Sequence, residues 1–541
     1  MNRRDFLKRC LSVAGGAAFG GVASAGVVFS NKAIDIRTPM KKTNVVFIVA
    51  DDLGYSDIGC FQNPADPNYI DTSQLDFSPN IDSIAANGVR LTNFYAHPVC
   101  TPTRFCALSG LYLKRSSVFH DLSTGGVLHA SDDNKGFNEH SIADPFKAAG
   151  YTTACIGKWH LGDGTMLQTN YPPTQPFSTT NPYHPDQAGF DYYYGFLGGS
   201  IDYEKHYVRG KTFDWFENRT MLWTDDGSGG NSHADEGKYA SHLLTEKAVN
   251  FINAHANKHP FFLYVPFVAP HWSQTAIQDE LHVHQLPKEE EIPPGQPGHD
   301  PALYRKYLSR SDAVLGTDDT DIRKRLIAMV SAMDDGIGEI LQSLRNHGIE
   351  ENTVVVFVGD NGGEQFYPDY TSVPYNPNDA IHYGSNNYPG RDDKATLYDG
   401  GIRVPAIFQW KGHLPTGQTT SQLASVIDLK LTIGRLAGLD MNSYPTDGVD
   451  LGPNLNSPAN HVTRDLFSSS KFFGKIYRKD NWKYVRRHNK GNDLGIDELY
   501  DLNADPHETT NLASSNPTKM QDLKTLCWNT YNDTNPPPLP S

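Results

Sequence analysis

Two short apolar runs, each followed at once by acidic or amide side chains, constrain the fold of this chain most strongly. The run at 45–50 is followed by Asp-Asp at 51–52, and the run at 354–358 is followed by Gly-Asp-Asn at 359–361. Continuous β-branched runs of this length are typical of strands buried on both faces of a parallel sheet. Open α/β sheets bind their ligands at the carboxyl ends of such strands. We therefore predict an α/β fold with a polar site at this edge of the sheet.

The polar residues after the two runs form a set of oxygen donors. Asp51, Asp52, Asp360 and Asn361 suit Ca²⁺ or Mg²⁺ rather than zinc, which favours nitrogen and sulfur ligands. One such cluster is an ordinary turn, because Asp, Asn and Gly are common in turns. Two clusters, together with the motif described next, favour a metal site.

Residues 100–110 read Cys-Thr-Pro-Thr-Arg-Phe-Cys-Ala-Leu-Ser-Gly. By itself, Cys100 is best interpreted as a small buried hydrophobic residue, as most free cysteines are. The run resembles the signature of the type I sulfatases, Cys-x-Pro-x-Arg followed by Ser or Thr and then Gly, and Cys100, Pro102, Arg104, Ser109 and Gly110 all fit it. The resemblance implies that a maturase oxidises Cys100 to Cα-formylglycine (3-oxoalanine).

An aldehyde suits the hydrolysis of a sulfate ester. Its hydrate carries two hydroxyls on one carbon, so one hydroxyl attacks sulfur. The other can lose its proton and expel sulfate by C–O cleavage, which divides one difficult step into two easier ones.

Three further segments contribute candidate site residues, and two of them add to the resemblance. Gly-Lys-Trp-His-Leu-Gly at 157–162 follows a predicted strand at 152–156, Ala-Pro-His-Trp at 269–272 follows the apolar run 261–268, and Lys394 begins Lys-Ala-Thr-Leu-Tyr-Asp-Gly-Gly-Ile-Arg. The first and third of these segments resemble family motifs.

The resemblance implies a role for each site residue. The metal ligands would be Asp51, Asp52, Cys100, Asp360 and Asn361. The cations that hold the anionic sulfuryl group would be Arg104, Lys158 and Lys394, an electrostatic contribution that often dominates catalysis. His271 would protonate the leaving oxygen, and His160 would take the proton from the aldehyde hydrate.

The length of 541 residues exceeds what one hydrophobic core normally serves, so two domains are expected. The resemblance implies an alkaline-phosphatase-like fold, with a large mixed, mostly parallel sheet between helices and a smaller C-terminal α+β subdomain. We predict a signal peptide at 1–25, a catalytic domain at 26–455 and the subdomain at 456–541. Alternation at 475–487 predicts paired strands within that subdomain, and the Glu-Leu-Tyr-Asp-Leu segment at 498–502 predicts a further strand, followed by a turn and a final helix.

Other elements follow from periodicity and composition. Residues 323–347 carry apolar side chains at helical spacing, and Ser-Pro-Asn begins a short helix at 78–88. Long segments at 163–210, 274–320 and 364–393 have no strong period or are rich in Pro, Gly, Tyr and Asn. Such loops are often functional, so we expect them to contribute the substrate pocket.

The N-terminus resembles a twin-arginine export signal. Arg3 and Arg4 precede Phe-Leu-Lys at 6–8, an apolar stretch follows, and Ala-Ser-Ala at 23–25 fits the cleavage rule. We predict a periplasmic or secreted bacterial protein, exported by the twin-arginine machinery and without a stable membrane span after cleavage. A retained, uncleaved anchor is the alternative.

The chain has six cysteines. Cys10 lies in the predicted signal, and Cys100 is the predicted nucleophile. The spacing of the other four is irregular for zinc, and disulfides are possible in an exported protein, so their pairing stays open: Cys60, Cys106, Cys155 and Cys527.

Three functional classes compete. A formal net charge of −15 argues against nonspecific nucleic-acid binding. A sulfatase is favoured over a phosphatase or phosphodiesterase of the same superfamily. Those enzymes typically use a Ser or Thr nucleophile with paired zinc ions, whereas this chain has a cysteine in the signature and oxygen donors for the metal. A noncatalytic protein on the same scaffold would have lost some of these positions.

The substrate is predicted from two segments. Asn-Asn-Tyr-Pro-Gly-Arg-Asp-Asp-Lys at 386–394 and Gly-Phe-Leu-Gly-Gly-Ser-Ile-Asp-Tyr at 195–203 resemble the N-acetylgalactosamine-4-sulfatase branch. A sulfated polysaccharide or oligosaccharide is therefore the predicted substrate, with a simple aryl sulfate as the alternative.

Overall fold

The computed structural model describes residues 42–535 apart from 67–76, 117–140, 163–183, 273–305, 366–383 and shorter gaps between 204 and 237, between 316 and 320, and at 471, 490–491 and 534. The predicted signal at 1–25 lies outside the described residues, as does most of the predicted loops at 274–320 and 364–393. Among the described helices, none combines the length and apolar character needed to cross a membrane.

A ten-stranded mixed sheet forms the centre of the described structure, in the order β14-β2-β13-β12-β1-β11-β3-β4-β7-β8. Its strands are β1 (Asn44–Asp51), β2 (Val89–Tyr95), β3 (Thr152–Lys158), β4 (Tyr192–Phe196), β7 (Phe216–Glu217), β8 (Thr220–Met221), β11 (Phe261–Pro270), β12 (Thr353–Gly359), β13 (Ala406–Gln409) and β14 (Gln418–Ser425). The run β12-β1-β11-β3-β4 is parallel throughout, whereas β13 is antiparallel to both of its neighbours. The predicted mixed, mostly parallel sheet is confirmed.

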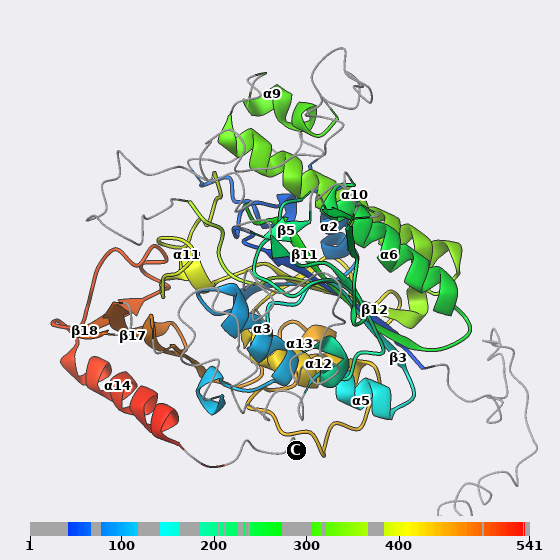
Figure 1. The fold of residues 1–541 in the computed structure, drawn as a ribbon. Coiled ribbons are helices and arrows are strands. Elements are labelled where there is room, and N and C mark those ends of the chain that lie inside the picture. The colour runs from blue at the N-terminus through cyan, green and yellow to red at the C-terminus, as the bar shows by residue number, and fades with distance from the viewer. Residues whose placement is uncertain are drawn as a thin grey trace, which may run out of the picture. The chain divides into compact units, whose positions relative to one another are not determined.

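Helices cover both faces of this sheet (Figure 1). One face carries α2 (Pro79–Ala86), α6 (Ala240–His255) and α10 (Ile322–Asn346), and the other carries α3 (Cys100–Ser109), α5 (Ala143–Ala148), α12 (Leu429–Leu436) and α13 (Gly452–Asn456). Strand β1 serves both cores, because Val46 and Ile48 pack on the first face and Val45 and Phe47 on the second. This alternation explains why the run at 45–50 is apolar at every position.

The two predicted helices are confirmed. Helix α10 spans Ile322–Asn346, where 323–347 was expected, and the side chain of Asp321 caps it by accepting from the Lys324 N–H at 2.8 Å. Helix α2 begins at Pro79, in the position at which proline is favoured. Short elements outside the central sheet and the C-terminal part include α9 (Asp312–Leu315), α11 (Asp399–Ile402) and the ribbons of β5 (Tyr207–Val208) with β6 (Thr212–Phe213) and β9 (Trp223–Asp225) with β10 (Asn231–His233).

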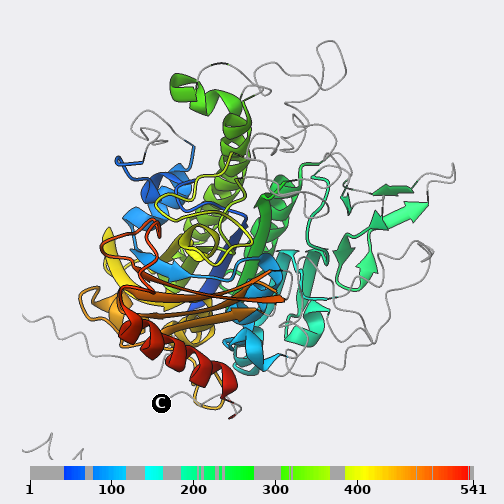
Figure 2. The same ribbon diagram turned by 90° about the vertical axis from the view of Figure 1, so that its left-hand side faces the viewer.

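The C-terminal part forms a separate antiparallel sheet. Its four strands are β15 (Leu466–Ser470), β16 (Gly474–Lys479), β17 (Trp482–Asn489) and β18 (Asn492–Asp501). The predicted paired strands at 475–487 are β16 and β17, and α14 (Pro517–Asn532) lies across the sheet (Figure 2). Leu523 and Cys527 of α14 pack on Tyr484 and Leu499 of the sheet. The domain boundary at 456 stays a prediction.

The cysteines left open by the sequence are free thiols in the described structure. Cys106, Cys155 and Cys527 are buried, and Cys60 is half-buried. Their places in the cores fit the role of small hydrophobic residues.

A buried cluster of charges joins the C-terminal sheet to α11. The Lys483 ammonium lies 2.8 Å from Asp399 Oδ1 and 2.8 Å from Glu508 Oε1. Glu508 Oε2 also accepts from the Asp399 N–H at 2.6 Å, and the Tyr95 hydroxyl donates to Asp399 Oδ2 at 2.8 Å. All four residues are buried. Lys483 is the cation closest to both carboxylates, and Arg403 Nη1 also lies 3.9 Å from Asp399 Oδ2. A buried charge that loses its partner is strongly destabilising.

We expect Lys483→Ala to lower the free energy of unfolding by about 3–5 kcal/mol, since it removes the cation closest to two buried carboxylates. Urea unfolding monitored by circular dichroism measures this loss. Lys411→Ala is the matched control, because Lys411 pairs with Glu350 at 2.6 Å on the surface. We expect almost no shift for the control, and equal shifts in the two variants would contradict the role assigned to the cluster.

Candidate active site

Four parallel strands deliver polar side chains to one edge of the sheet. Asp51 ends β1, Lys158 ends β3, His271 follows β11, and Asp360 follows β12. The pairing of Ala50 with Gly359 places the ends of β1 and β12 side by side. The structure therefore shows these motifs together at the edge formed by the carboxyl ends of the parallel strands, as the sequence predicts.

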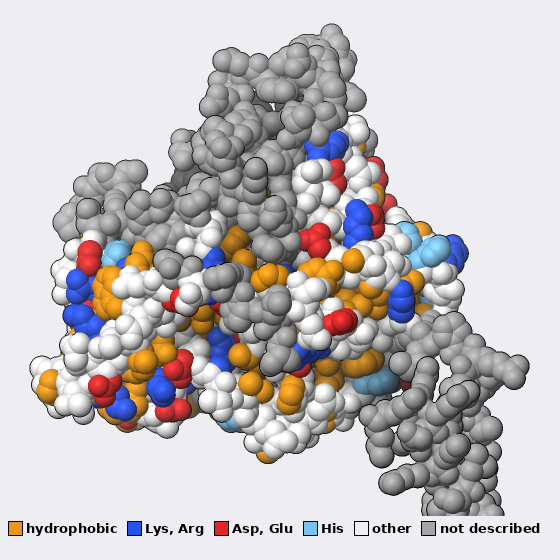
Figure 3. Space-filling view, turned by 90° about the horizontal axis from the view of Figure 1, so that it is seen from below, with side chains coloured by type: hydrophobic (Ala, Val, Ile, Leu, Met, Phe, Trp, Pro, Cys, Tyr) orange, Lys and Arg blue, Asp and Glu red, His pale blue; other side chains and the backbone are white. Residues whose placement is uncertain are grey.

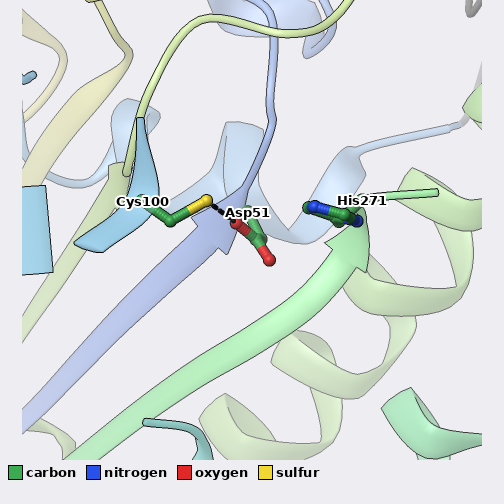
Figure 4. A group of neighbouring side chains, drawn as sticks. All are labelled: Asp51, Cys100 and His271. Atoms are coloured by element: carbon green, nitrogen blue, oxygen red, sulfur yellow. Dashed lines mark hydrogen bonds between the residues drawn. The ribbon is translucent and has the colours of Figure 1, made fainter. Parts of the chain in front are cut away.

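Cys100 is the first residue of α3 and faces the end of β1. Its Sγ lies 3.2 Å from Asp51 Oδ1 and 4.0 Å from Asp52 Oδ1. Figure 4 shows Sγ directed at Asp51, with His271 on the other side of that carboxylate. Burial, and then the charges of Asp360 and Asp51, raise the pKa of the Cys100 thiol well above its usual range. The unmodified side chain is therefore a protonated thiol and a poor nucleophile.

Three cations meet the carboxylates around Cys100. The Arg104 guanidinium, one helical turn after Cys100, lies 2.8 Å from Asp360 Oδ2. Lys158 Nζ lies 2.5 Å from Asp51 Oδ2, and Lys394 Nζ lies 2.6 Å from Asp52 Oδ2. Arg104 also donates to the carbonyl of Lys158 at 3.1 Å. Buried charges require such partners, so the cations and carboxylates hold one another in place.

His271 stands between a lysine and a carboxylate. Its Nδ1 lies 2.7 Å from the carbonyl of Trp272, which only accepts, so Nδ1 carries the hydrogen. Its Nε2 lies 3.4 Å from Lys394 Nζ and 3.4 Å from Asp52 Oδ2. Burial lowers the pKa of His271 to about 3, although Asp52 opposes the shift. An anion bound beside Nε2 would also favour the charged imidazolium.

His160 is buried, and within the described part of the chain neither of its ring nitrogens has a hydrogen-bond partner. Burial, and then the charge of Lys158, lower the pKa of His160 well below its usual value. Its backbone is left-handed, with φ of 53°. Two unpaired nitrogens in a buried position are costly unless they act on a ligand, so His160 is a candidate proton acceptor.

Sequence reasoning missed Glu364 and Trp272. The indole N–H of Trp272 donates to Glu364 Oε2 at 2.7 Å, and that oxygen lies 3.8 Å from Lys394 Nζ. Burial raises the pKa of Glu364 to about 7. Glu364 follows two glycines after Asn361 and begins the segment 364–393, which the sequence predicts to contribute to the substrate pocket, but it belongs to no quoted motif and nothing in the sequence assigns it a role.

The oxygen-rich cluster fits a hard divalent cation. One ligand atom from each of Asp51, Asp52, Cys100 and Asp360 lies within 4.8 Å of the others. Asn361 donates its amide to Asp52 Oδ1 at 2.7 Å, and its own buried Oδ1 has no hydrogen-bond partner among the described residues. A buried acceptor without a donor is rare, and an amide oxygen is a suitable ligand for Ca²⁺ or Mg²⁺.

The structure thus brings every predicted site residue to one place: Asp51, Asp52, Cys100, Arg104, Lys158, His160, His271, Asp360, Asn361 and Lys394. Their roles stay predictions.

Comparisons with known proteins agree with this arrangement. Mouse N-acetylgalactosamine-6-sulfatase is 29% identical over 431 residues, which cover 76% of this chain and 66% of that protein, just under two thirds of its length. Human arylsulfatase A is 27% identical over 534 residues, covering 89% of this chain and 86% of that protein.

Among solved structures, Ps i-CgsB in complex with k-i-k-neocarrahexaose is similar with a TM-score of 0.65 and 26% identity. The match covers 91% of this chain and 94% of that one. The Sulfatase family model matches residues 43–439, which is well over half of the chain. The chain therefore belongs to the sulfatase family.

Proposed function

We propose that this protein is a sulfuric ester hydrolase that removes sulfate from a sulfated carbohydrate. The observation that carries the proposal is the position of Cys100, at the start of α3, 3.2 Å from Asp51 and within the group of Arg104, Lys158 and Lys394. A site that places three cations around one reactive side chain suits an anionic ester. The names of the similar proteins, which include N-acetylgalactosamine-6-sulfatase and a neocarrahexaose complex, support a sugar substrate.

The reactive form of Cys100 in this proposal is formylglycine, installed by a maturase. The modified side chain supplies an aldehyde hydrate as the oxygen nucleophile. The amino end of α3 adds its partial positive charge at this point. Asp360 holds the Arg104 guanidinium in place, and Arg104 in turn orients the sulfuryl group. Lys158 and Lys394 neutralise the sulfuryl oxygens.

The proposed metal is one Ca²⁺, with Mg²⁺ as the alternative. Asp51, Asp52, Asp360, Asn361 and residue 100 would hold it. The bound cation would add positive charge to the site and help to orient the nucleophile. Its charge would also compete with Lys158 and Lys394 for the carboxylates, which would leave the two ammonium groups available to the substrate.

The two histidines divide the proton transfers in this proposal. His271 Nε2, between Lys394 and Asp52, gives a proton to the leaving oxygen. His160, whose ring nitrogens have no partner among the residues that the structure describes, accepts the proton of the nucleophile. Both transfers are general acid–base catalysis by imidazole.

A phosphatase or phosphodiesterase is the alternative from the same superfamily, and a simple arylsulfatase is the other. Oxygen donors outnumber nitrogen donors around Cys100, which favours calcium over paired zinc. A carbohydrate is favoured over an aryl sulfate by the cavity described in the next subsection.

Recognition of a sulfated polymer would be local. The chain carries a formal net charge of −15, and acidic and basic side chains are interspersed over the described part of the face in Figure 3. Long-range attraction of a polyanion is therefore weak, and affinity depends on the buried cations of the site. Twin-arginine export to the periplasm or beyond, after maturation, belongs to the same proposal.

The protein should bind one calcium ion per chain, and Asn361→Leu should lose it. The leucine has similar volume but removes the buried Oδ1 that lacks a protein partner. Elemental analysis and the calcium-dependent rise in Tm are the two measurements. Asn361→Asp, which keeps an oxygen in the same place, should retain the ion. Two zinc ions per chain would support the phosphatase alternative instead.

Cys100 should be found as formylglycine when the protein is made beside a competent maturase. Mass spectrometry of the peptide that carries residues 100–104 tests this directly. Cys100→Ala should abolish hydrolysis of sulfate esters while leaving Tm nearly unchanged, since the side chain is small. Full activity with an unmodified cysteine, or faster hydrolysis of phosphate than of sulfate esters, would overturn the proposed function.

His271→Ala should slow the hydrolysis of sugar sulfates far more than that of p-nitrophenyl sulfate. An alkoxide needs protonation as it leaves, whereas nitrophenolate does not, so the usual general-acid gain of about 10²–10⁴-fold is lost only for the sugar. His160→Ala should slow both substrates, because proton removal from the nucleophile is common to them. Equal losses for His271→Ala on the two substrates would assign the proton to another group.

A further inference from the structure

A polar cavity of about 500 Å³ lies outside the residues assigned above. Its described lining comes from three separate parts of the chain: Ala65, Asp66, Gln365, Asn386, Tyr388, Gly390 and His507. None of these residues is a predicted metal ligand, cation or proton carrier. The cavity is large enough for one sugar ring, and it combines polar groups with two aromatic rings.

The cavity borders the active site through two backbone connections. Gln365 directly follows Glu364, whose carboxylate lies 3.8 Å from Lys394 Nζ. The N–H of Gln365 donates at 3.0 Å to Asp393, the residue before Lys394. The segment from Asn386 to Gly390 forms another wall and leads along the chain to Lys394. Two lining segments of the cavity are therefore connected directly to the residues around Lys394.

The lining offers the two kinds of contact that sugars use. The rings of Tyr388 and His507 lie 5.3 Å apart at an angle of 53°, and each presents an apolar face. Gln365, Asn386 and Asp66 add amide and carboxylate groups. Among the described lining residues there is no lysine or arginine, whereas the sulfate-binding part of the site contains three such cations. The cavity therefore suits an uncharged ring rather than a second sulfate.

The walls are held in place before any ligand binds. The Asn386 amide donates to Asp66 Oδ2 at 2.6 Å, and the Tyr388 N–H donates to Asn386 Oδ1 at 3.0 Å. The Ser56 hydroxyl donates to the carbonyl of Tyr388 at 2.8 Å. On the other wall, the residue after His507 is the buried Glu508, whose carbonyl accepts from Arg391 at 3.0 Å. Such pre-organisation reduces the entropy cost of binding.

We propose that this cavity is a subsite for an unsulfated sugar residue next to the sulfated one in the substrate chain. The proposal rests on the proposed sulfatase function and specifies its substrate as a chain of at least two sugars with sulfate on one of them. Tyr388 and His507 hold the neighbouring ring by stacking, and Gln365 and Asp66 accept or donate hydrogen bonds to its hydroxyls. His507 is thus a specificity residue supplied by the C-terminal part of the chain.

The test compares a small substrate with chain substrates. Initial rates are measured on p-nitrophenyl sulfate, on k-i-k-neocarrahexaose and on a chondroitin 4-sulfate tetrasaccharide. His507→Ala and Tyr388→Ala should lower kcat/KM for the preferred chain substrate about tenfold, mostly through KM, which corresponds to the stacking energy of one ring. The rate on p-nitrophenyl sulfate, which does not reach the cavity, should change less than twofold.

His413→Ala is the matched control, because the ring of His413 stacks on Trp410 at 4.0 Å and lines a different part of the surface. It should change neither substrate class. His507 is exposed, so its variant tests the proposal even where Tyr388→Ala disturbs folding.

The outcomes separate the subsite from the function itself. Equal losses on small and chain substrates, or no loss on chain substrates, would overturn the subsite. The subsite would also be overturned if the wild-type protein hydrolyses p-nitrophenyl sulfate and desulfates neither chain substrate faster than it hydrolyses p-nitrophenyl sulfate. If no sulfate ester of any size is hydrolysed by the matured protein, the proposed function is wrong.

Discussion

Three buried carboxylates share one edge of the sheet with three cations, of which Arg104 and Lys158 are buried and Lys394 is half-buried, and neither group is stable there without the other. Moving a charge out of water costs several kcal/mol even after relaxation, so the pairs Asp51–Lys158, Asp52–Lys394 and Asp360–Arg104 have to form together. The carboxylates lie at the ends of strands β1 and β12, while the cations come from β3, α3 and the loop before α11. The requirement for mutual neutralisation therefore links five parts of the fold at a single point.

The same balance explains how one site could serve both a metal and an anion. Without a further cation, the lysines are committed to the carboxylates. A divalent cation on the oxygen cluster would satisfy those carboxylates and the orphaned Asn361 Oδ1 at once. Lys158 and Lys394 would then face a ligand as uncompensated charges, which is the condition that favours a tightly held sulfuryl group. Metal and substrate would each make the other's binding more favourable.

The local sequence pattern predicted the elements that depend on neighbouring residues alone, namely the buried strands and the amphipathic helix. The apolar runs before Asp51 and Asp360 are short and rich in β-branched residues, which favours buried strands over buried helices, and the helical spacing of α10 needed no tertiary information. Glu364 and the cavity at His507 could not be predicted in this way. The composition of 364–393 predicts part of the cavity lining, but the rest of the lining, which includes Asp66 and His507, lies more than a hundred residues away in the sequence, and no local pattern predicts the contact of Glu364 with Trp272.

The buried cluster at Lys483 shows what such distant contacts add. Asp399 lies five residues after Lys394, and its carboxylate and N–H are held by Lys483 and Glu508 of the C-terminal part. The N–H of Ala395 donates to the carbonyl of Pro98 at 2.8 Å, two residues before Cys100. The segment that carries Lys394 is thus fixed on one side to the C-terminal sheet and on the other to the start of α3. Because a lysine has four rotatable side-chain bonds, its ammonium is well placed only when its backbone is. The C-terminal sheet, although it supplies none of the charged groups around Cys100, therefore helps to set the position of one of the three cations on which the site depends.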